Sequence, residues 1–365
     1  MKKAFSASFI FDGKNWLKDH SVICSEGIID KILPVADLDK SMEVKSYPGL
    51  TLVPAFIDVQ VYGSSGKLFS VERDEATLSL MAEVFSKEGT VLFQPTIATN
   101  TKEVIKESID AVRNYKSKNG KGVHGLHIEG PWINADKRGA HLKELVHTPT
   151  IEEVKNLMEY GKGVVTMVTI APEVCSQEVV DLLCSYGVVV SAGHSDSRLN
   201  TAINSFDHGI SSITHLFNAM SPLHHREPGL TGAAMLHKKV KASIIPDGHH
   251  VSYDAIKIAK DIMGERLFAI TDAVTETSEG PYQHERKGDK FECNGTLSGS
   301  ALSMHQAFVN LVQQVGIEKG EAHRMCSLYP AQVLGLEKKY GRIAPQFAGQ
   351  FLVMNEQLKL VDVIT

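Results

Sequence analysis

The sequence predicts an α/β protein, a (β/α)8 TIM-like barrel with a small β-sandwich domain formed by the N- and C-terminal segments. Eight short apolar runs recur through the middle of the chain, and helical patterns lie between them. Both ends of the chain are instead rich in short β-type segments separated by turn residues. We therefore expect residues 1–50 and 341–365 to form the small domain and residues 51–340 to form the barrel.

The two terminal regions have the composition of hairpin strands. Near the N-terminus the apolar stretches are interrupted at Asp12-Gly13 and at Ser25-Glu26-Gly27, where the residue types favour turns. A similar pattern returns after residue 340, so the two ends are expected to complete one small sheet. The expected strands are Lys2–Phe11, Ser21–Cys24, Gly27–Leu33, Gly341–Ile343, Gln350–Asn355 and Leu358–Val363.

The barrel is expected to alternate strands and helices, which gives a parallel sheet with helices outside. Its strands are expected at Ala55–Tyr62, Thr90–Thr96, Gly122–Glu129, Val164–Thr169, Val188–Gly193, Ser211–Thr214, Lys241–Ile245 and Leu267–Thr271. Helices with apolar residues spaced at three and four are expected at Asp74–Lys87, Lys102–Lys116, Ile151–Tyr160, Ser176–Tyr186, Ser197–Asn204 and Tyr253–Met263. After the eighth strand, the polar segment Tyr282–Asn294 is expected to pass over the barrel mouth, before helices at Thr296–Val315 and Gly320–Leu328.

Composition and charge exclude several classes of protein. A chain of 365 residues with 43% hydrophobic content can bury a full core, which argues against disorder. The formal net charge of −5 and the absence of Lys/Arg clusters argue against nucleic acid or an anionic membrane as a partner. The five cysteines are scattered and never in a C-x-x-C arrangement, so we expect reduced thiols in a cytoplasmic protein.

Missing motifs narrow the choice further. No apolar run approaches the ~20 residues that a membrane span needs. The chain has no G-x-x-x-x-G-K-[ST] loop, no G-x-G-x-x-G opening a helix and no G-x-S-x-G elbow. These absences disfavour nucleotide hydrolysis, Rossmann cofactor binding and serine acyl chemistry.

The strongest group of candidate residues is Glu129, His194 and His215, at the ends of the third, fifth and sixth expected strands. One carboxylate and two imidazoles can bind a divalent ion and leave a fourth position for water, which is typical of catalytic rather than structural zinc. Each residue alone has a structural alternative, because a histidine at a strand end is often a satisfied polar group. Their common position at the ends of nearby strands favours the metal site. By default, we expect the remaining histidines His124, His127, His237, His249 and His305 to be structural or surface residues.

Asp272 ends the eighth expected strand. A carboxylate beside a metal-bound water, but outside the ligand set, is placed to accept the proton of that water and later deliver it to a leaving group. The structural alternative is a cap for the segment that follows. The presence of the metal set favours the catalytic role.

Loops after the expected strands carry residues suited to an anionic substrate. His141 follows the run Arg138-Gly139-Ala140, and His250 ends the segment that begins at Asp247. Arg226 supplies a guanidinium, the side chain best matched to a phosphate. Rim loops are commonly polar, so each residue alone is weak evidence, but together they indicate a polar pocket.

Seven motifs together resemble the N-acetylglucosamine-6-phosphate deacetylase family of the amidohydrolase superfamily. They cover the chain from about residue 50 to 310 in the order of the family, and HIEGPW and THLFNAM are specific to it. The motifs are Pro54–Asp58, His127–Trp132, Gly193–Ser195, Thr214–Met220, Asp247–His250, Thr271–Ala273 and Leu297–Ser300. The resemblance implies hydrolysis of an amino-sugar phosphate in amino-sugar catabolism, by a homodimer.

The resemblance also implies a role for individual residues. Glu129, His194 and His215 would bind the metal, and Asp272 would be the general acid and base. Arg226 would reach the phosphate of the substrate bound by the neighbouring subunit. The implied substrate-binding residues are Ala140, His141, Asn218, Ala219, Arg226, His250, Leu297, Ser298 and Gly299.

One departure from the superfamily pattern affects the metal count. Amidohydrolases with two metals have His-x-His at the end of the first strand, whereas this chain has Gln60-Val61-Tyr62. Glutamine is a poor zinc ligand and neutral tyrosine a poorer one, so we expect one divalent ion per subunit, preferably Zn²⁺. A second ion would require a ligand that the sequence does not identify.

The resulting hypothesis is a metal-dependent amide hydrolase acting on N-acetyl-D-glucosamine 6-phosphate. The ion would lower the pKa of its bound water toward ~7, Asp272 would accept the proton, and His141 with the ion would stabilise the oxyanion. Two alternatives stay open. The first is the same reaction on N-acetylgalactosamine 6-phosphate, and the second is an inactive barrel that acts as a binding or scaffold protein.

Overall fold

The computed structural model describes residues 2–365, which form two compact units. The first unit contains the chain up to Ile57 together with Phe85–Val91 and Met304–Thr365. The second unit contains Asp58–Val84 and Leu92–Ser303. No helix between residues 2 and 365 is long and apolar enough to cross a membrane. The division into domains at residues 50 and 340 stays a prediction.

The first unit contains the expected small β domain, with both ends of the chain in one six-stranded sheet. The sheet order is β19-β18-β4-β1-β2-β3, and β18 pairs antiparallel with β4. Its core includes Phe5, Val22, Ile29, Leu52 and Phe351. The strands are β1 (Lys2–Phe11), β2 (Trp16–Ser25), β3 (Ile28–Pro34), β4 (Val44–Pro54), β18 (Phe351–Met354) and β19 (Leu360–Ile364), with a 3-10 turn η1 (Val35–Asp37) after β3.

Two sequence expectations for this unit and the segment before it are wrong. Gly341–Ile343 is not a strand, because Gly341 adopts a φ of 83° and Ile343 is anchored through one hydrogen bond to the Asp12 carbonyl. Thr296–Val315 is not one helix, because its first residues pair with another strand as β17 (Thr296–Ser300) and the helix α9 (Met304–Gln313) begins later. Helices α10 (Lys319–Cys326) and α11 (Leu328–Val333) complete the first unit.

The barrel strands form one eight-stranded sheet in the order β14-β13-β12-β11-β10-β9-β8-β5. The pairings recorded from β8 to β14 are parallel. The sequence located all eight strands, and the observed bounds are β5 (Phe56–Val61), β8 (Thr90–Ala98), β9 (Leu126–Glu129), β10 (Val165–Ile170), β11 (Val189–Ala192), β12 (Ser212–Ile213), β13 (Lys241–Ile244) and β14 (Leu267–Ala269). This confirms the (β/α)8 prediction.

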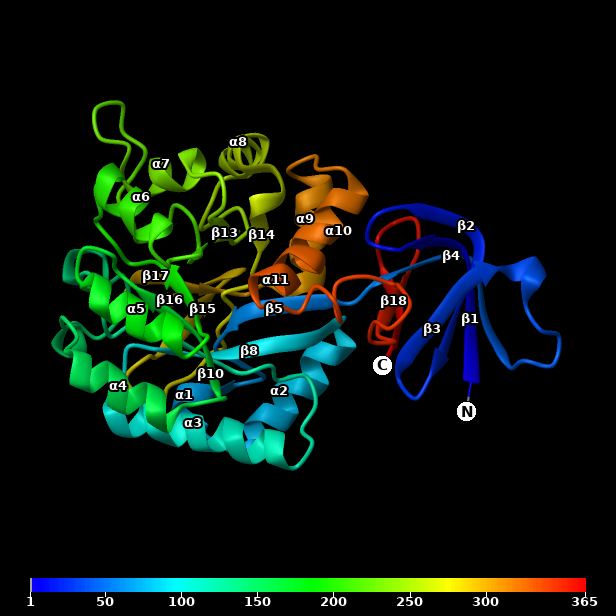
Figure 1. Ribbon diagram of the computed structural model, residues 1–365, viewed down its shortest axis with the longest axis horizontal. Coiled ribbons are helices and arrows are strands. Elements are labelled where there is room, and N and C mark those ends of the chain that lie inside the picture. Colours follow the sequence, from blue (N-terminus) through cyan, green and yellow to red (C-terminus); the bar gives the residue numbers. More distant parts are fainter. Residues whose placement is uncertain (1) are drawn as a thin grey trace. The chain divides into compact units, whose positions relative to one another are not determined.

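Helices alternate with these strands and surround the sheet (Figure 1). The six predicted helices are present as α2 (Glu75–Lys87), α3 (Lys102–Ser117), α4 (Ile151–Tyr160), α5 (Gln177–Ser185), α6 (Leu199–Asp207) and α8 (Tyr253–Met263). Thr101, Thr150, Ser176 and Ser252 cap four of them with side-chain hydrogen bonds. The sequence missed α7 (Gly229–Leu236), because all its residues except Leu236 are buried and no amphipathic pattern is present.

The first and eighth strands stand at the two ends of the sheet order, and the residues at their ends meet through backbone and side-chain hydrogen bonds. The Asp272 N–H donates to the Gln60 carbonyl at 3.0 Å, and the Tyr62 N–H donates to the Ala273 carbonyl at 2.9 Å. The buried Asp58 carboxylate also accepts hydrogen bonds from the Thr271 N–H and hydroxyl. The residues at both strand ends are therefore held in a fixed register.

Shorter elements surround the barrel mouth. The polar segment after the eighth strand is a hairpin of β15 (His284–Lys287) and β16 (Lys290–Cys293), extended by β17. A second small hairpin follows the first strand, with β6 (Gly63–Ser64), β7 (Lys67–Leu68) and the short helix α1 (Phe69–Glu72). Three 3-10 turns lie on other loops, η2 (Ala135–Lys137), η3 (Lys143–Leu145) and η4 (Gly264–Arg266).

Candidate functional site

The backbone brings the four principal candidates to one end of the barrel. Glu129 is the last residue of β9, and His194, His215 and Asp272 follow β11, β12 and β14 within three residues. The last three have φ values of 48°, 37° and 54°, in the left-handed region that residues with a Cβ rarely adopt. Such a conformation costs about 1–2 kcal/mol per residue and is typical of functional sites, where the surrounding fold enforces it.

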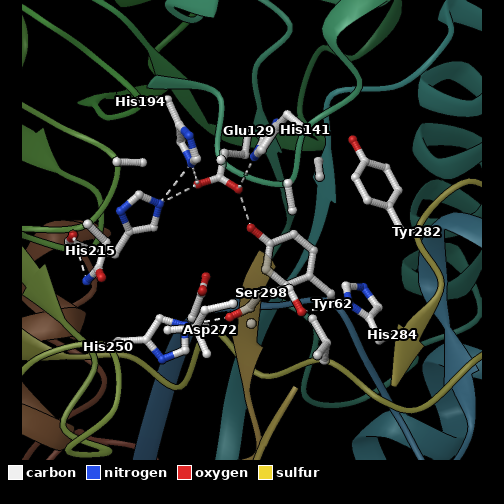
Figure 2. Close-up of a pocket in the computed structure, with 18 of the residues that line it drawn as sticks. Tyr62, Glu129, His141, His194, His215, His250, Asp272, Tyr282, His284 and Ser298 are labelled. Atoms are coloured by element: carbon white, nitrogen blue, oxygen red, sulfur yellow. Dashed lines mark hydrogen bonds and ion pairs between the residues drawn. The ribbon is translucent and has the colours of Figure 1, made fainter. Parts of the chain in front are cut away.

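A carboxylate and three imidazoles form the centre of the site (Figure 2). Oε1 of Glu129 lies 3.0 Å from Nε2 of His215 and 3.3 Å from Nε2 of His194. The two histidine Nε2 atoms lie 3.0 Å from each other. On the other side of the carboxylate, Oε2 lies 3.3 Å from Nε2 of His141. All four side chains are buried.

The hydrogen bonds of the outer ring nitrogens separate the roles of His141 and His194. Nδ1 of His141 accepts a bond from the Thr99 N–H at 3.2 Å, so the proton of this neutral ring is on Nε2. Nδ1 of His194 instead donates to the Lys137 carbonyl at 2.9 Å, which leaves a lone pair on Nε2. Glu129, His141 and His194 each offer a ligand atom within 4.8 Å of the others, but the His141 tautomer makes it a donor rather than a ligand.

The donor atoms of Glu129, His194 and His215 fit a divalent ion. Ligands of a tetrahedral zinc at about 2.0–2.1 Å from the ion stand roughly 3.3 Å from one another. The three observed separations are 3.0, 3.0 and 3.3 Å. Two imidazole nitrogens at 3.0 Å repel each other when both carry lone pairs, and a cation between them removes this repulsion. The positions of Glu129, His194 and His215 therefore fit the divalent ion that the motif resemblance implies.

The electrostatics of the centre favour ligand-competent forms. Burial raises the pKa of Glu129, but the neighbouring histidines outweigh this effect and hold that pKa well below its ordinary value. Burial and the adjacent His194 lower the pKa of His141 to about 4, and burial also lowers the pKa of His215. Burial and Glu129 raise the pKa of Tyr62 well above its ordinary value. At pH 7 the centre thus holds a carboxylate, neutral imidazoles at His141 and His215, and a neutral phenol.

Asp272 presents a free carboxylate oxygen beside this centre. It is 8% exposed, and Oδ1 has no hydrogen-bond partner among residues 2–365. Burial, followed by the charges of Glu129, Asp58 and Asp247, raises the pKa of Asp272 well above its ordinary value. An unpaired buried carboxyl oxygen is costly to keep, so its retention favours a chemical role over a structural one.

The site opens into a cavity of about 410 Å³. Every predicted substrate-binding residue except Arg226 lines this cavity, namely Ala140, His141, Asn218, Ala219, His250, Leu297, Ser298 and Gly299. Arg226 is exposed on the loop before α7 and does not line the cavity of its own chain. The prediction that Arg226 serves a neighbouring subunit is compatible with this position.

His250 and Ser298 join two loops at the cavity wall. Nδ1 of His250 lies 2.6 Å from Asp247 Oδ2, and Nε2 lies 2.5 Å from the Ser298 carbonyl oxygen. These two contacts fix the orientation of the His250 ring on the cavity wall. They also hold the loop of Asp247 against the loop of Ser298.

Sequence reasoning missed part of the cavity wall. Tyr282 and His284, from the hairpin after the eighth strand, line the cavity, as do Leu68 and Ser70 after the first strand. The Tyr282 hydroxyl donates to the Thr99 carbonyl at 2.5 Å and so supports the strand end that orients His141. Only the polar character of Tyr282–Asn294 pointed to this wall, since no periodic pattern indicated which side chains face inward.

Comparisons with known proteins agree with the motifs. A model described as "Amidohydrolase family" matches residues 51–364, and one described as "NagA composite domain" matches residues 4–52. N-acetylglucosamine-6-phosphate deacetylase of Haemophilus influenzae is 33% identical over 354 residues, covering 94% of this chain and 92% of that protein. N-acetylgalactosamine-6-phosphate deacetylase of Escherichia coli O157:H7 is 29% identical, covering 94% and 93%.

A solved structure agrees over the whole chain. The crystal structure of N-acetylglucosamine-6-phosphate deacetylase from Pasteurella multocida has a TM-score of 0.95 and 30% identity, and the match covers 100% of this chain and 98% of that one. The resemblance inferred from the motifs is thereby confirmed, and with it a hydrolytic enzyme class. The amidohydrolase match over residues 51–364 implies a divalent metal. The chain belongs to the amidohydrolase family.

Proposed function

We propose that this protein hydrolyses N-acetyl-D-glucosamine 6-phosphate to D-glucosamine 6-phosphate and acetate, in amino-sugar catabolism. One observation carries the proposal: the donor atoms of Glu129, His194 and His215 converge at tetrahedral spacing beside the free carboxyl oxygen of Asp272. The relatives at 33% and 30% identity carry the name of this activity.

The proposed cofactor is one divalent ion per subunit, preferably Zn²⁺, held by Glu129, His194 and His215. When bound, such an ion polarises a carbonyl oxygen and makes a water molecule nucleophilic at neutral pH. The mixed carboxylate and imidazole donor set supports zinc, and the absence of His-x-His after the first strand supports a single ion.

Asp272 and His141 are the proposed catalytic residues of the chain. The free oxygen of Asp272 accepts the proton of the attacking water and returns it to the departing amine nitrogen, because an amide anion is too basic to leave. The Nε2–H of His141 donates to the oxygen that becomes negative as the acetyl carbon turns tetrahedral. The Thr99 N–H fixes the required tautomer, which supports this role.

The proposed substrate phosphate is bound near His250 and by Arg226 of a neighbouring subunit in a homodimer. Four large apolar side chains on or beside α7 and α8 support a subunit interface there, with exposed fractions of 56% for Leu223, 59% for Leu236, 58% for Ile258 and 51% for Ile262. The two helices contact each other, and the Arg226 loop leads directly into α7. A partner that covers these side chains would also receive Arg226.

Hybrid dimers test this arrangement. Arg226→Ala subunits are expected to have reduced activity alone, and His194→Ala subunits are expected to be nearly inactive. In a mixed dimer the subunit with intact metal ligands also receives an intact Arg226, so one of its two sites should recover. If subunit exchange is proven and activity does not recover, each chain completes its own site.

The epimer N-acetylgalactosamine 6-phosphate is the alternative substrate, because a relative of similar coverage carries that name. A deacetylation assay over N-acetyl hexosamines, with and without the 6-phosphate, decides between them. We expect the highest kcat/KM for the gluco epimer with its phosphate. A higher kcat/KM for the galacto epimer would make N-acetylgalactosamine 6-phosphate the assigned substrate. If the metal-loaded protein released no acetate from any of these sugars, the remaining alternative would be a binding or scaffold protein.

We also propose a cytoplasmic location. None of the five cysteines forms a disulfide in the described part of the chain, and three of them are buried. Reduced thiols in this number suit a reducing compartment.

A further inference from the structure

Gln60 and Tyr62, at the end of β5, contact the candidate metal ligand Glu129 directly. The Gln60 side-chain amide donates to Glu129 Oε1 at 3.1 Å and to the Tyr62 hydroxyl at 2.9 Å. The Tyr62 hydroxyl donates to Glu129 Oε2. Figure 2 shows the Tyr62 hydroxyl pointing toward this carboxylate. These two residues occupy the sequence positions where a two-metal relative would have histidine ligands.

The two donors constrain both oxygens of the carboxylate. A carboxylate offers about four lone-pair positions in its plane. Gln60 and the two histidine Nε2 atoms face Oε1, whereas Tyr62 and His141 face Oε2. Because Tyr62 and His141 both bond to Oε2, the carboxylate cannot rotate without breaking both contacts. Oε1 therefore stays directed at the space between His194 and His215.

The backbone of the same segment also holds Asp272. The Gln60 carbonyl accepts the Asp272 N–H, and the Tyr62 N–H donates to the next carbonyl, that of Ala273. Side-chain substitutions at Gln60 or Tyr62 leave these backbone bonds possible, so their effect on Glu129 can be measured separately from the barrel closure.

We propose that Gln60 and Tyr62 are positioning residues, which together hold the Glu129 carboxylate in its ligand orientation and provide hydrogen-bond donors where a second cation would otherwise stand. Neutral donors can orient the carboxylate without adding a competing ion. This inference rests on the proposed function for the ligand role of Glu129, but ion binding is measured without any sugar.

The test measures Zn²⁺ binding to metal-free protein by competition with a chromophoric chelator, and the absorption spectrum of the Co²⁺-loaded protein. Hydrogen-bond partners of metal ligands typically contribute about 10–100-fold to metal affinity. Tyr62→Phe and Gln60→Leu should each weaken Zn²⁺ binding by a factor in this range, keep a stoichiometry near one and shift the Co²⁺ bands. With substrate, kcat should fall more than KM rises.

Tyr115→Phe is the matched control. Tyr115 is also a buried phenol, but its hydroxyl donates to the Lys121 carbonyl at 2.9 Å and it does not line the cavity. Its Zn²⁺ affinity and Co²⁺ spectrum should match the unmodified protein. Unchanged affinity and spectrum in Tyr62→Phe would overturn the proposal, and so would equal weakening by Tyr115→Phe. If Tyr62→Phe does not fold, Gln60→Leu decides by the same criteria. Failure of the unmodified protein to bind Zn²⁺ would refute the proposed function itself.

Discussion

Two levels of the same barrel interior contain buried polar side chains with opposite hydrogen-bonding behaviour. The lower level comprises His127, Thr169, Ser191 and Thr214, all between 0% and 1% exposed. The upper level comprises Glu129, His194, His215 and Asp272, at 2% to 8% exposed. Strands β9, β11 and β12, or the residues just after them, contribute to both levels. Burial and residue type alone therefore do not distinguish the lower level from the upper level.

In the lower level the polar groups bond to one another. His127 contacts the Val59 carbonyl at 3.2 Å through Nδ1 and the Thr169 hydroxyl at 2.8 Å through Nε2. The Thr169 hydroxyl bonds to Thr214, which bonds to Ser191. Burial lowers the pKa of His127 to about 4, so the ring is neutral and both nitrogens are satisfied. Such a network stabilises a fold and offers nothing to a ligand.

In the upper level, groups crowd together or lack partners. Nδ1 of His215 and Oδ1 of Asp272 have no hydrogen-bond partner among residues 2–365, and two imidazole nitrogens stand 3.0 Å apart. Three residues there also adopt left-handed backbone conformations. Between these two levels, the unsatisfied and strained polar groups are those of the candidate site, whereas the groups of the lower level satisfy one another.

Removing the ion from the upper level should have the largest effect. Chelation should abolish turnover in a single step, and one equivalent of Zn²⁺ per chain should restore it, because Glu129, His194 and His215 supply three positions of a tetrahedral site. Metal analysis of fully active protein should give close to one equivalent. Gln60→His combined with Tyr62→His can add a second site but should not be required for activity.

Activity that rises only with a second equivalent would contradict this expectation. It would mean that a ligand other than a histidine pair completes a two-metal centre, and that the upper level is larger than the four residues compared above.

Asp272→Asn should have the next largest effect. The substitution keeps the size of the side chain and removes its ability to accept the proton, so kcat should fall by roughly 10²- to 10⁴-fold. Zn²⁺ stoichiometry should stay near one. The exposed Asp181 of α5 accepts a hydrogen bond from Gln177 at 2.8 Å and does not line the cavity, so Asp181→Asn is a suitable control with near-normal kcat. Near-normal kcat in Asp272→Asn would return Asp272 to a structural role.

Loss of the substrate phosphate should have an intermediate effect. Charge-assisted hydrogen bonds contribute ~1.5–3 kcal/mol each, so the unphosphorylated sugar should lose about 10²-fold or more in kcat/KM. Arg226→Ala should reproduce part of this loss with the phosphorylated sugar and little of it with the unphosphorylated one. Arg113→Ala, an arginine on the outer helix α3, serves as the control. Comparable kcat/KM for both sugars would contradict the phosphate assignment.

The sequence predicted the barrel and the candidate residues of its upper level because the strands are distinct apolar runs, nearly all of which end in a polar residue able to do chemistry. Residues such as Glu129 and Asp272 could therefore be located by position along the chain. The cavity wall formed by Tyr282 and His284 could not, because it depends on how a hairpin folds over the mouth rather than on any local period. The sequence also did not reveal that Tyr62 donates a hydrogen bond to Glu129. The only indication at this position was that the histidine of two-metal relatives is missing.

The same limit applies to some helices and to backbone conformation. The pattern of Gly229–Leu236 is too uniformly apolar to indicate a helix face, so α7 was missed. The left-handed φ values of His194, His215 and Asp272 are imposed by the surrounding fold. No local residue pattern predicts these φ values. The satisfied bonds of His127 likewise became visible only when strands distant in sequence were brought together.

The smallest effect on activity is expected from Thr169→Val, in the lower level. Valine has nearly the shape of threonine, but it leaves Nε2 of His127 without a donor and removes one bond from Thr214. An unsatisfied buried polar group costs about 1–3 kcal/mol, so the free energy of unfolding should fall by that amount. Zn²⁺ affinity and kcat should change little, since no atom of Thr169 lines the cavity.

Thr201→Val, at an exposed position of α6, should change stability by less than about 0.5 kcal/mol and serves as the control. Chemical denaturation of the metal-free proteins measures the stability difference without the contribution of the ion. If Thr169→Val instead reduced kcat as strongly as Asp272→Asn while leaving stability intact, the lower level would belong to the catalytic apparatus and hydrogen-bond satisfaction would not distinguish the two levels.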